Sequence, residues 1–416
     1  MNNQTYKHKS VRPPFIALTS TALALLIVFS LSASGWGVGR GTYSILPEYE
    51  RRLDKVVLSL AVSTDSLSLH RSIIESMPDY TEVLILTPHK NVKEIGNNLR
   101  AMEQSGNVRL IPFDSRKLKN TNAYVLSSRE HRLKTVNKPM SMPSGSIWAQ
   151  DLFEVVRGEN GKSSILTPYL HKWFIRPGRP GERKLISDNS YIGELLSPGL
   201  TVESLPLVFK GGNVLVDEFK GRRIAFCGGD VLRETQMVYK SALGRHISGK
   251  EIISKMKRYL NVDQVIVIGA SLPQPHKLFH LDQAMVLLPG GTAGVTRIID
   301  GVMHKNDTDI YSINIFLDEL RAKLRELGYR IVDMDATVAD ALDYRYYVNG
   351  VPYVNSTTGK REFLLPTFDS SEVGINREIY KNNVSALERL GYRVIPVHTH
   401  ANEHHGGIHC MLNVIS

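Results

Sequence analysis

Three residue types that can act together on a polar carbon atom occur in separate stretches of the chain. Residues 279–285 (FHLDQAM) contain His280 and Asp282, which lie on one face if the segment is extended. Residues 398–416 contain Cys410 within the run GGIHC. A cysteine, a histidine and carboxylates dispersed through a chain without zinc spacing can form a hydrolase with a cysteine nucleophile.

Two further stretches place polar residues between apolar runs. Residues 146–154 (SIWAQDLFE) contain Trp148 and Asp151, and residues 209–217 (FKGGNVLVD) contain two glycines before Asn213. The glycines allow a tight bend of the backbone. Each of these motifs, and the His-x-Asp pair as well, also occurs in purely structural roles. The residues alone therefore leave both interpretations open.

The C-terminal stretch is rich in histidine, and a transition metal is an alternative ligand for it. The side chains concerned are His398, His400, His404, His405, His409 and Glu403. Their spacing matches no closed zinc motif and the stretch has one thiol, so we predict no metal site. The second cysteine, Cys227, is expected to be a small core residue, with a disulfide to Cys410 as the alternative.

The composition is that of a globular protein. Of 416 residues, 42% are hydrophobic and 22% charged, which excludes both a disordered chain and a protein with many membrane spans. The net charge of +10 comes without a basic run or aromatic residues between basic ones, so we predict no nucleic-acid partner. Two cysteines exclude a disulfide scaffold.

The N-terminus has the pattern of an export segment. Lys7, Lys9 and Arg12 precede an uncharged run at residues 15–33. We expect residues 1–34 to be a signal peptide or an N-terminal membrane anchor, followed by a linker at 35–54. The protein is thus expected outside the cytoplasm, either periplasmic or secreted, with membrane attachment through this segment as the alternative.

Short β-branched runs alternate with helix-period stretches from residue 55 onward, which predicts one α/β domain at residues 55–416. The pattern around Gly328 (residues 324–331) returns around Gly391 (residues 387–394), 391 − 328 = 63 residues later. In both copies a helix is expected to end at the glycine and a strand to begin at once. A unit repeated at this period suggests radial or tandem repetition of one supersecondary element.

Taken together, the motifs resemble those of the guanidine-modifying enzymes, or pentein superfamily, which includes agmatine, arginine and protein-arginine deiminases. The resemblance covers residues 55–416 and rests on four motifs in order: Trp148-Ala-Gln-Asp151, Gly211-Gly212-Asn213, His280-Leu-Asp282 and Gly406-Gly407-Ile-His409-Cys410. It implies a five-fold pseudosymmetric α/β propeller, in which the 63-residue repeat would be one blade seen twice.

The resemblance also implies roles for individual residues. Cys410 would be the nucleophile, His280 the general acid and base, and Asp151 and Asp282 the carboxylates that hold a guanidinium group. Trp148 and Asn213 would also contact the substrate. The products would be a ureido group and ammonia, formed through a covalent S-amidino intermediate. The chemistry requires no cofactor, and the sequence does not exclude calcium.

Two positions depart from the agmatine deiminases, which carry Arg and Glu where this chain has Gln150 and Lys210. Glu154 and Asn413 are more similar to protein-arginine deiminases. The expected substrate is therefore an arginyl peptide or protein, with agmatine second. We expect Lys210 to point away from the pocket, because a cation there would repel arginine. Amidino transfer and a non-catalytic exported metal- or ligand-binding protein are the other hypotheses, and no oligomeric state is predicted.

Overall fold

The computed structural model divides the chain into two compact units, residues 1–40 and 41–416. The structure describes residues 43–59, 64–99, 107–113, 123–127, 132–136, 148–158, 163–172, 183–186, 196, 201–242, 244–270, 274–300, 307–369 and 374–415. The predicted export segment at residues 15–33 lies outside these ranges. Of the helices within them, none has the length and apolar character needed to cross a membrane.

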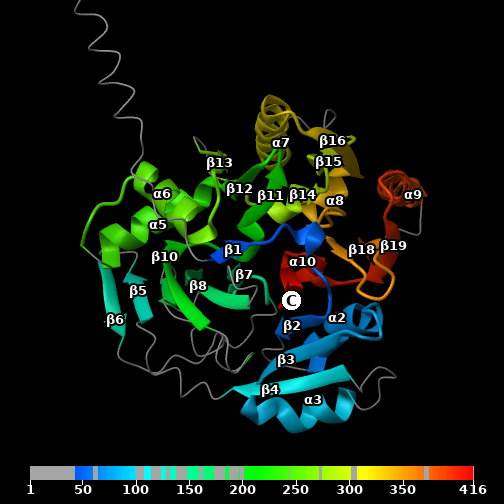
Figure 1. The fold of residues 1–416 in the computed structure, drawn as a ribbon, viewed down its shortest axis with the longest axis horizontal. Coiled ribbons are helices and arrows are strands. Elements are labelled where there is room, and N and C mark those ends of the chain that lie inside the picture. Colours follow the sequence, from blue (N-terminus) through cyan, green and yellow to red (C-terminus); the bar gives the residue numbers. More distant parts are fainter. Residues whose placement is uncertain are drawn as a thin grey trace, which may run out of the picture. The chain divides into compact units, whose positions relative to one another are not determined.

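The second unit is a mixed α/β fold that contains several sheets (Figure 1). Three sheets share one pairing pattern, in which the first two strands are antiparallel and the last two parallel. Their strands are β11 (Val214–Phe219), β12 (Arg222–Gly228) and β13 (Gln264–Ile268); β14 (Met285–Leu288), β15 (Thr292–Ile298) and β16 (Arg330–Ala336); and β17 (Val351–Val354), β18 (Arg361–Thr367) and β19 (Arg393–His398).

Two larger sheets contain the same pattern with additional strands. In the first, β20 pairs antiparallel with β2, and β3 and β4 follow in parallel. In the second, β7 pairs antiparallel with β8, which pairs in parallel with β10. The strands of these two sheets are β20 (Leu412–Val414), β2 (Lys55–Ser59), β3 (Glu82–Pro88) and β4 (Val108–Phe113); and β1 (Tyr43–Ile45), β5 (Ala123–Ser127), β6 (Arg132–Val136), β7 (Glu154–Gly158), β8 (Ser163–Lys172), β9 (Arg183–Ile186) and β10 (Thr201–Val208).

The α/β class is thus confirmed, and the five sheets are not closed into one barrel, since no strand pair in the described ranges joins one sheet to another. Figure 1 shows helix α10 (Ile408–Met411) lying among the sheets. The remaining helices are η1 (Glu48–Glu50), α2 (Thr64–Glu75), η2 (His89–Asn91), α3 (Val92–Leu99), η4 (Gly211–Asn213), α5 (Gly229–Ala242), α6 (Gly249–Leu260), η5 (Leu281–Gln283), α7 (Thr308–Leu327), α8 (Val338–Leu342), α9 (Gly374–Arg389) and η8 (Ala401–His404).

The compact unit begins earlier than the sequence indicated. Strand β1 and helix η1 fall in the predicted linker at 35–54, yet β1 pairs with β7, and the Tyr49 hydroxyl donates a hydrogen bond to buried Asp217 (2.5 Å). Their short polar sequence gave no periodic signal. These contacts make residues 43–54 part of the compact unit that begins at residue 41.

The helix–glycine–strand repeat is confirmed. Helix α7 is followed by Gly328 (φ 85°) and β16, and α9 is followed by Gly391 (φ 84°) and β19. A third copy joins α6 to β13 through Asn261 (φ 50°). Asparagine tolerates the left-handed conformation better than most residues, so the turn is kept although the glycine is absent.

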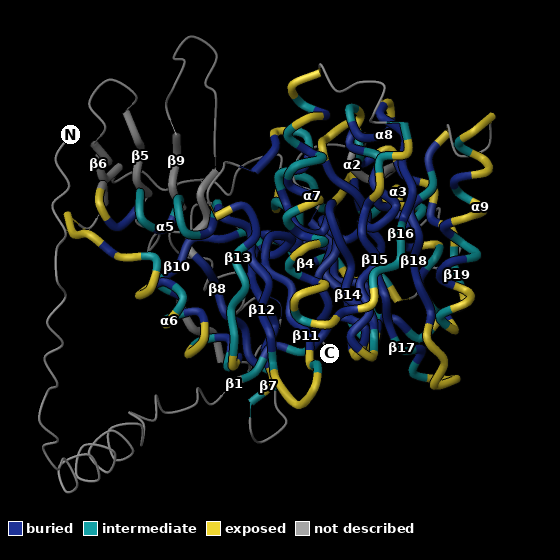
Figure 2. Tube along the Cα trace, turned by 90° about the horizontal axis from the view of Figure 1, so that it is seen from above, coloured by how far each residue is buried: buried dark blue, intermediate teal, exposed yellow. Residues whose placement is uncertain are grey.

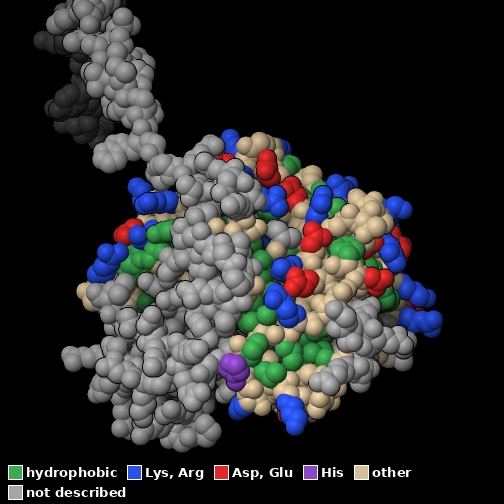
Figure 3. All heavy atoms as spheres, turned by 60° about the horizontal axis from the view of Figure 1, so that its bottom comes forward, with side chains coloured by type: hydrophobic (Ala, Val, Ile, Leu, Met, Phe, Trp, Pro, Cys, Tyr) green, Lys and Arg blue, Asp and Glu red, His purple; other side chains and the backbone are tan. Residues whose placement is uncertain are grey.

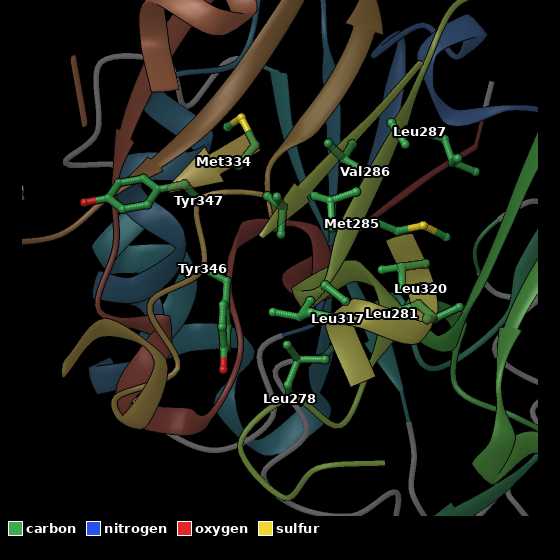
Figure 4. Close-up of a cluster of buried hydrophobic side chains, with 14 of the residues drawn as sticks. Leu278, Leu281, Met285, Val286, Leu287, Leu317, Leu320, Met334, Tyr346 and Tyr347 are labelled. Atoms are coloured by element: carbon green, nitrogen blue, oxygen red, sulfur yellow. The ribbon is translucent and has the colours of Figure 1, made fainter. Parts of the chain in front are cut away.

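The hydrophobic core supports η5, the short helix that follows His280. Leu281 is fully buried and belongs to the same cluster as Met285, Leu317 and Leu320 (Figure 4). Helix α7 contributes this apolar face, and its opposite side is exposed (Figure 2). Packing of large aliphatic side chains at native density fixes the backbone that carries them. The core therefore holds the segment around His280 and Asp282 in one position.

On the surface, basic and acidic side chains are interspersed over the described part of the face in Figure 3. The positive net charge is therefore not gathered into one basic patch on this face.

Substitution of Gly391 tests the left-handed turn. A Cβ at Gly391 would meet no atom within 4 Å, so Gly391→Ala should lose stability only through backbone strain, about 1–2 kcal/mol. Gly391→Asn should lose less, as Asn261 already adopts this conformation. Urea denaturation of the three proteins measures the differences, and an alanine variant as stable as the wild type would contradict the assignment.

Candidate active site

Cys410, His280 and Asp282 converge in one buried cluster. One sulfur, nitrogen or oxygen atom of each lies within 4.8 Å of the corresponding atoms of the other two. The Cys410 thiol donates a hydrogen bond to Asp282 Oδ2 (3.1 Å). The three residues are exposed by only 5%, 5% and 2%, respectively. The structure thus brings together a sulfur, an imidazole and a carboxylate that are distant in sequence.

Two glycines allow α10 to place Cys410 in this cluster. A Cβ at Gly407 would lie 2.5 Å from the Asn349 side chain, and one at Gly406 would lie 2.6 Å from the Trp148 ring. Without side chains at these positions, Asn349 Nδ2 approaches Cys410 Sγ to 3.4 Å. Close packing of backbone against side chains is the physical reason for the Gly-Gly pair.

The Trp-Ala-Gln-Asp motif joins the same site from another side. The Gln150 N–H donates to the Cys410 carbonyl oxygen (3.3 Å), and the next residue is buried Asp151. The negative charge of Asp151 acts on the thiol of Cys410. Asp151 is therefore near enough for its charge to act on Cys410, whereas Trp148 packs against Gly406 and the neighbouring hydrophobic core.

The Gly-Gly-Asn motif positions η5. A Cβ at Gly212 would lie 2.4 Å from Asp282 Oδ2, so only glycine fits beside this carboxylate. Asn213 Oδ1 accepts hydrogen bonds from the Leu281 N–H (3.2 Å) and from Gln274 Nε2 (3.0 Å), and Asn213 Nδ2 donates to Gln274 Oε1 (2.9 Å). Its amide thus holds the backbone of η5.

A buried ion pair between His409 and Glu48 lies beside Asp282. His409 lies between two carboxylates, with Nδ1 2.8 Å from Asp282 Oδ2 and Nε2 2.7 Å from Glu48 Oε1. Burial alone would lower the pKa of His409, but the charge of Glu48 and the hydrogen bonds to both acids raise it to about 10. Burial opposes ionisation of Glu48, yet the His409 cation lowers the pKa of this acid. His409 is therefore an imidazolium at neutral pH.

In contrast to the charged pair of His409 and Glu48, Cys410 and His280 are held in their neutral forms. Burial, and then the charge of Asp282, raise the pKa of the Cys410 thiol well above its ordinary value. Burial, and then the positive charges of Lys210 and His409, lower the pKa of His280 well below its ordinary value. The free site therefore holds a neutral thiol beside a neutral imidazole.

A further acid is buried close to the site. Glu154 is exposed by 1%, and burial raises its pKa to about 8. Its Oε1 has no hydrogen-bond partner in the described part of the chain. A Cβ at Gly211 would lie 2.9 Å from that oxygen, so the Gly-Gly motif also makes room for Glu154.

A cavity of about 410 Å³ leads to His280. Asn213, Gln274 and Phe279 line it as well, whereas Cys410, Asp151 and Asp282 are buried and do not. Lys210 also lines this cavity, with Nζ 5.5 Å from the centre of the Phe279 ring. The expectation that Lys210 points away was wrong, because the flat face of Phe279 offers the ammonium group a favourable position.

The disulfide alternative is also wrong, because both cysteines are free. Cys227 lies in β12 with its side chain fully buried, and burial raises the pKa of its thiol to about 12. It is a core residue, as predicted.

Sequence reasoning missed Glu48, Asn349 and the role of His409. Glu48 and His409 are 361 positions apart, so no local spacing could link them. The one available signal was the position of His409 directly before Cys410. Asn349 carries no motif in the sequence, and only the packing of Gly407 reveals it.

Three solved structures share this fold over nearly the whole chain. A C. jejuni agmatine deiminase is 14% identical, covers 92% of this chain and 98% of its own, and has a TM-score of 0.59. A putative arginine deiminase from Porphyromonas gingivalis is 17% identical, covers 89% of this chain and 97% of its own, and has a TM-score of 0.60. An Enterococcus faecalis agmatine deiminase is 12% identical, covers 91% of this chain and 98% of its own, and has a TM-score of 0.59. The comparison with curated proteins found no match.

The likeness to these three structures, each of them less than 25% identical to this chain, shows a shared fold. The family model described as Porphyromonas-type peptidyl-arginine deiminase matches residues 69–413. The chain therefore belongs to this family of deiminases, which hydrolyse guanidino C–N bonds.

The Glu48–His409 pair can be tested by paired substitutions in η1. Glu48→Gln removes one charge from a buried pair and should lower the free energy of unfolding by about 3 kcal/mol at neutral pH. Glu50→Gln, two residues away and exposed, should change it little. Because the pKa of His409 is raised to about 10, its contribution is complete below about pH 6.5 and disappears as the pH rises through 10.

The difference between wild type and Glu48→Gln should therefore shrink on the alkaline side. Denaturation curves recorded from neutral to alkaline pH measure it. A difference that stays constant through pH 10 would show that His409 is not held as a cation.

Proposed function

We propose that this protein converts the guanidinium group of peptidyl-arginine to a ureido group with release of ammonia. The observation that carries the proposal is a set of buried polar atoms without partners around the Cys410 thiol. Asp282 Oδ1 and both ring nitrogens of His280 have no hydrogen-bond partner among the described residues. Buried groups of this kind are costly unless a ligand satisfies them, and a guanidinium group offers several N–H donors.

Two carboxylates are available to hold that cation. Asp282 Oδ2 is occupied by His409 and the Cys410 thiol, which leaves Oδ1 for the substrate. We assign the second carboxylate to Asp151, a buried acid whose negative charge acts on the Cys410 thiol. Bidentate contacts of this type orient a planar guanidinium and place its carbon against the sulfur.

The substrate itself would activate the nucleophile. In the free site Cys410 is held as a thiol and His280 as a neutral imidazole. A bound guanidinium adds a positive charge beside Asp282, the group that opposes ionisation of the thiol. Neutral His280 can then accept the thiol proton, so attack is coupled to substrate binding.

The remaining steps balance in protons. Cys410 Sγ bonds to the guanidinium carbon while its proton passes to His280. The C–N bond to the departing nitrogen breaks as His280 returns that proton, and ammonia leaves. The S-amidino intermediate keeps the positive charge. Water then attacks its carbon while His280 takes one water proton, and the C–S bond breaks as His280 returns this proton to the sulfur. The second water proton is released to solvent, where it converts the free ammonia to ammonium, and a neutral ureido group remains. The steps use side chains of this chain alone, so they require no cofactor.

Trp148 and Asn213, expected to contact the substrate, are better explained as positioning residues. Trp148 packs on Gly406 beside α10. Asn213 borders the cavity, but its amide is already hydrogen-bonded to Gln274 and to the backbone of η5. Both would act on the reaction through the placement of Cys410 and Asp282.

Lys210 favours peptidyl-arginine over agmatine. Agmatine has an ammonium group at the end opposite its guanidinium, whereas an arginine within a peptide has a neutral backbone there. Lys210 lines the cavity, and no acid of the described residues lies within ion-pair distance of its ammonium group. Two acids line the cavity as well: Asp230 is paired with Arg233, and Glu234 has an interaction of its own. A second cation in the cavity is therefore opposed by Lys210.

The same proposal covers architecture and location. We infer that the five sheets are variants of one unit with five-fold pseudosymmetry, since each contains an antiparallel pair extended by a parallel strand. We also propose that residues 15–33 direct export, with periplasmic, secreted and membrane-anchored forms as the outcomes of cell fractionation. An extracytoplasmic location suits a protein or peptide substrate.

Replacement of Cys410 tests the mechanism. Cys410→Ser should lower citrulline formation on an arginyl peptide by at least about a thousandfold, because serine lacks the acidity and nucleophilicity of a thiol. Cys227→Ser is the matched control and should retain activity. Intact-mass measurement of the wild type under turnover should show an adduct on Cys410.

Undiminished activity of Cys410→Ser would contradict the proposal. Ammonia release in water without any amine acceptor separates hydrolysis from amidino transfer. Release only in the presence of an added amine would favour transfer.

Replacement of Lys210 tests the substrate. Lys210→Met should raise kcat/KM for agmatine relative to an arginyl peptide by about fivefold, because about 1 kcal/mol of charge repulsion is removed. Lys220, which also lies over a phenylalanine ring but does not line the cavity, provides the control variant Lys220→Met. An unchanged ratio, or agmatine preferred by the wild type, would transfer the assignment to agmatine.

A further inference from the structure

A second cluster of metal-ligating side chains lies outside the catalytic site. Asp369, His398 and His400 each offer one atom, and these atoms all lie within 4.8 Å of one another. His398 Nε2 is 3.1 Å from Asp369 Oδ1, and the rings of His398 and His400 are 4.9 Å apart between their centres. All three side chains are exposed, so a solute can reach them.

The sheet delivers these side chains to one place. β18 and β19 are parallel, with Thr367 opposite His398, so both strands end at the same edge. The ladder continues for one more bond, from the Thr399 N–H to the Thr367 carbonyl oxygen (3.0 Å). Asp369 and His400 follow directly, and the register of the ladder fixes their separation.

Buried and exposed side chains alternate along residues 368–369 and 398–400, and the three ligands are at the exposed positions. Phe368 is buried before exposed Asp369, and Thr399 is buried between exposed His398 and His400. Thr399 Oγ1 also accepts a hydrogen bond from the Ala401 N–H (3.0 Å). The backbone at each ligand is therefore anchored from inside.

A neighbouring acid completes the arrangement. Glu403 Oε1 lies 3.9 Å from His400 Nδ1. At this distance the carboxylate makes no hydrogen bond to the ring, but its negative charge adds to the attraction of a cation.

We propose that Asp369, His398 and His400 bind a divalent transition-metal cation of the zinc type. Two imidazole nitrogens and one carboxylate oxygen suit zinc and its neighbours, whereas calcium and magnesium prefer oxygen ligands alone. Three protein ligands leave a further position for water or another ligand. The site shares no residue with the catalytic cluster, so it stands or falls independently of the proposed function.

The proposed metal site lies beside a wall that two cavities share, so a bound metal would affect that wall. His400 and Asp369 line a hollow of about 450 Å³ together with Tyr344 and His405, and the latter two also line the cavity that leads to His280. His405 stacks on Tyr344 with ring centres 4.3 Å apart. A metal on His400 would fix the beginning of the segment that ends at His405, and so steady the wall shared by the two cavities.

Zinc binding to the untagged full-length protein tests the proposal. Calorimetric titration with zinc ions, and the metal content after dialysis, should give one zinc per chain. The double variant His398→Ala/His400→Ala should lose at least tenfold in affinity, and Asp369→Asn should weaken binding as well. His246→Ala, an exposed histidine on another segment, should bind as the wild type does.

The buried cluster of His280, Asp282 and Cys410 is the competing zinc site, and Cys410→Ser separates the two. Zinc retained by Cys410→Ser and lost by the double variant supports the proposal. Zinc lost by Cys410→Ser and retained by the double variant overturns it, as does a thiolate-to-cobalt absorption band after cobalt substitution. Absence of zinc binding by the wild type also overturns it.

Discussion

The arrangement of the site depends on one carboxylate, that of Asp282, which contacts both His409 and Cys410. Asp282 Oδ2 contacts the His409 imidazolium and the Cys410 thiol, while its Oδ1 has no hydrogen-bond partner in the part of the chain that the structure describes. A buried carboxylate needs a cation close by. His409, itself paired with Glu48, supplies this cation. In the proposed mechanism, Asp282 Oδ1 is the atom that attracts the substrate.

The elements around Asp282 bury its carboxylate together with the charged side chains of His409 and Glu48. Glycines at positions 212, 406 and 407 let backbone and side chains approach where any Cβ would collide. The leucine-rich core that packs against η5 fixes the position of the backbone that carries Asp282. The pKa shifts of Cys410 and His280 keep both groups neutral in the free site. In the proposed mechanism, the negative charge of Asp282 therefore acts on the incoming guanidinium group, and the thiol becomes reactive only when that group is bound.

The sequence was most informative where residues carry chemistry within a short motif. Cys410, His280, Asp282 and Asp151 were predicted this way, and the structure places the first three in one cluster. The glycine turns at 328 and 391 revealed the repeat. It was least informative where a role arises only from packing between distant segments. Glu48 lay in a stretch assigned to a linker, Asn349 had no motif, and the third turn used Asn261 instead of glycine. Lys210 was placed wrongly because charge repulsion was considered without the aromatic ring that receives its ammonium group.

The pairing of β20 with β2, and the contact between Glu48 and His409 across 361 positions, have a consequence for folding. Contacts between remote parts of a chain must close a long loop before they return any free energy, and folding slows as such contacts dominate. We therefore expect the region around Cys410 to become ordered late in folding. Until then, the edge of β2 and the apolar residues around α10 would be exposed to association with other chains, so slow formation of these contacts would lower the yield of folded protein.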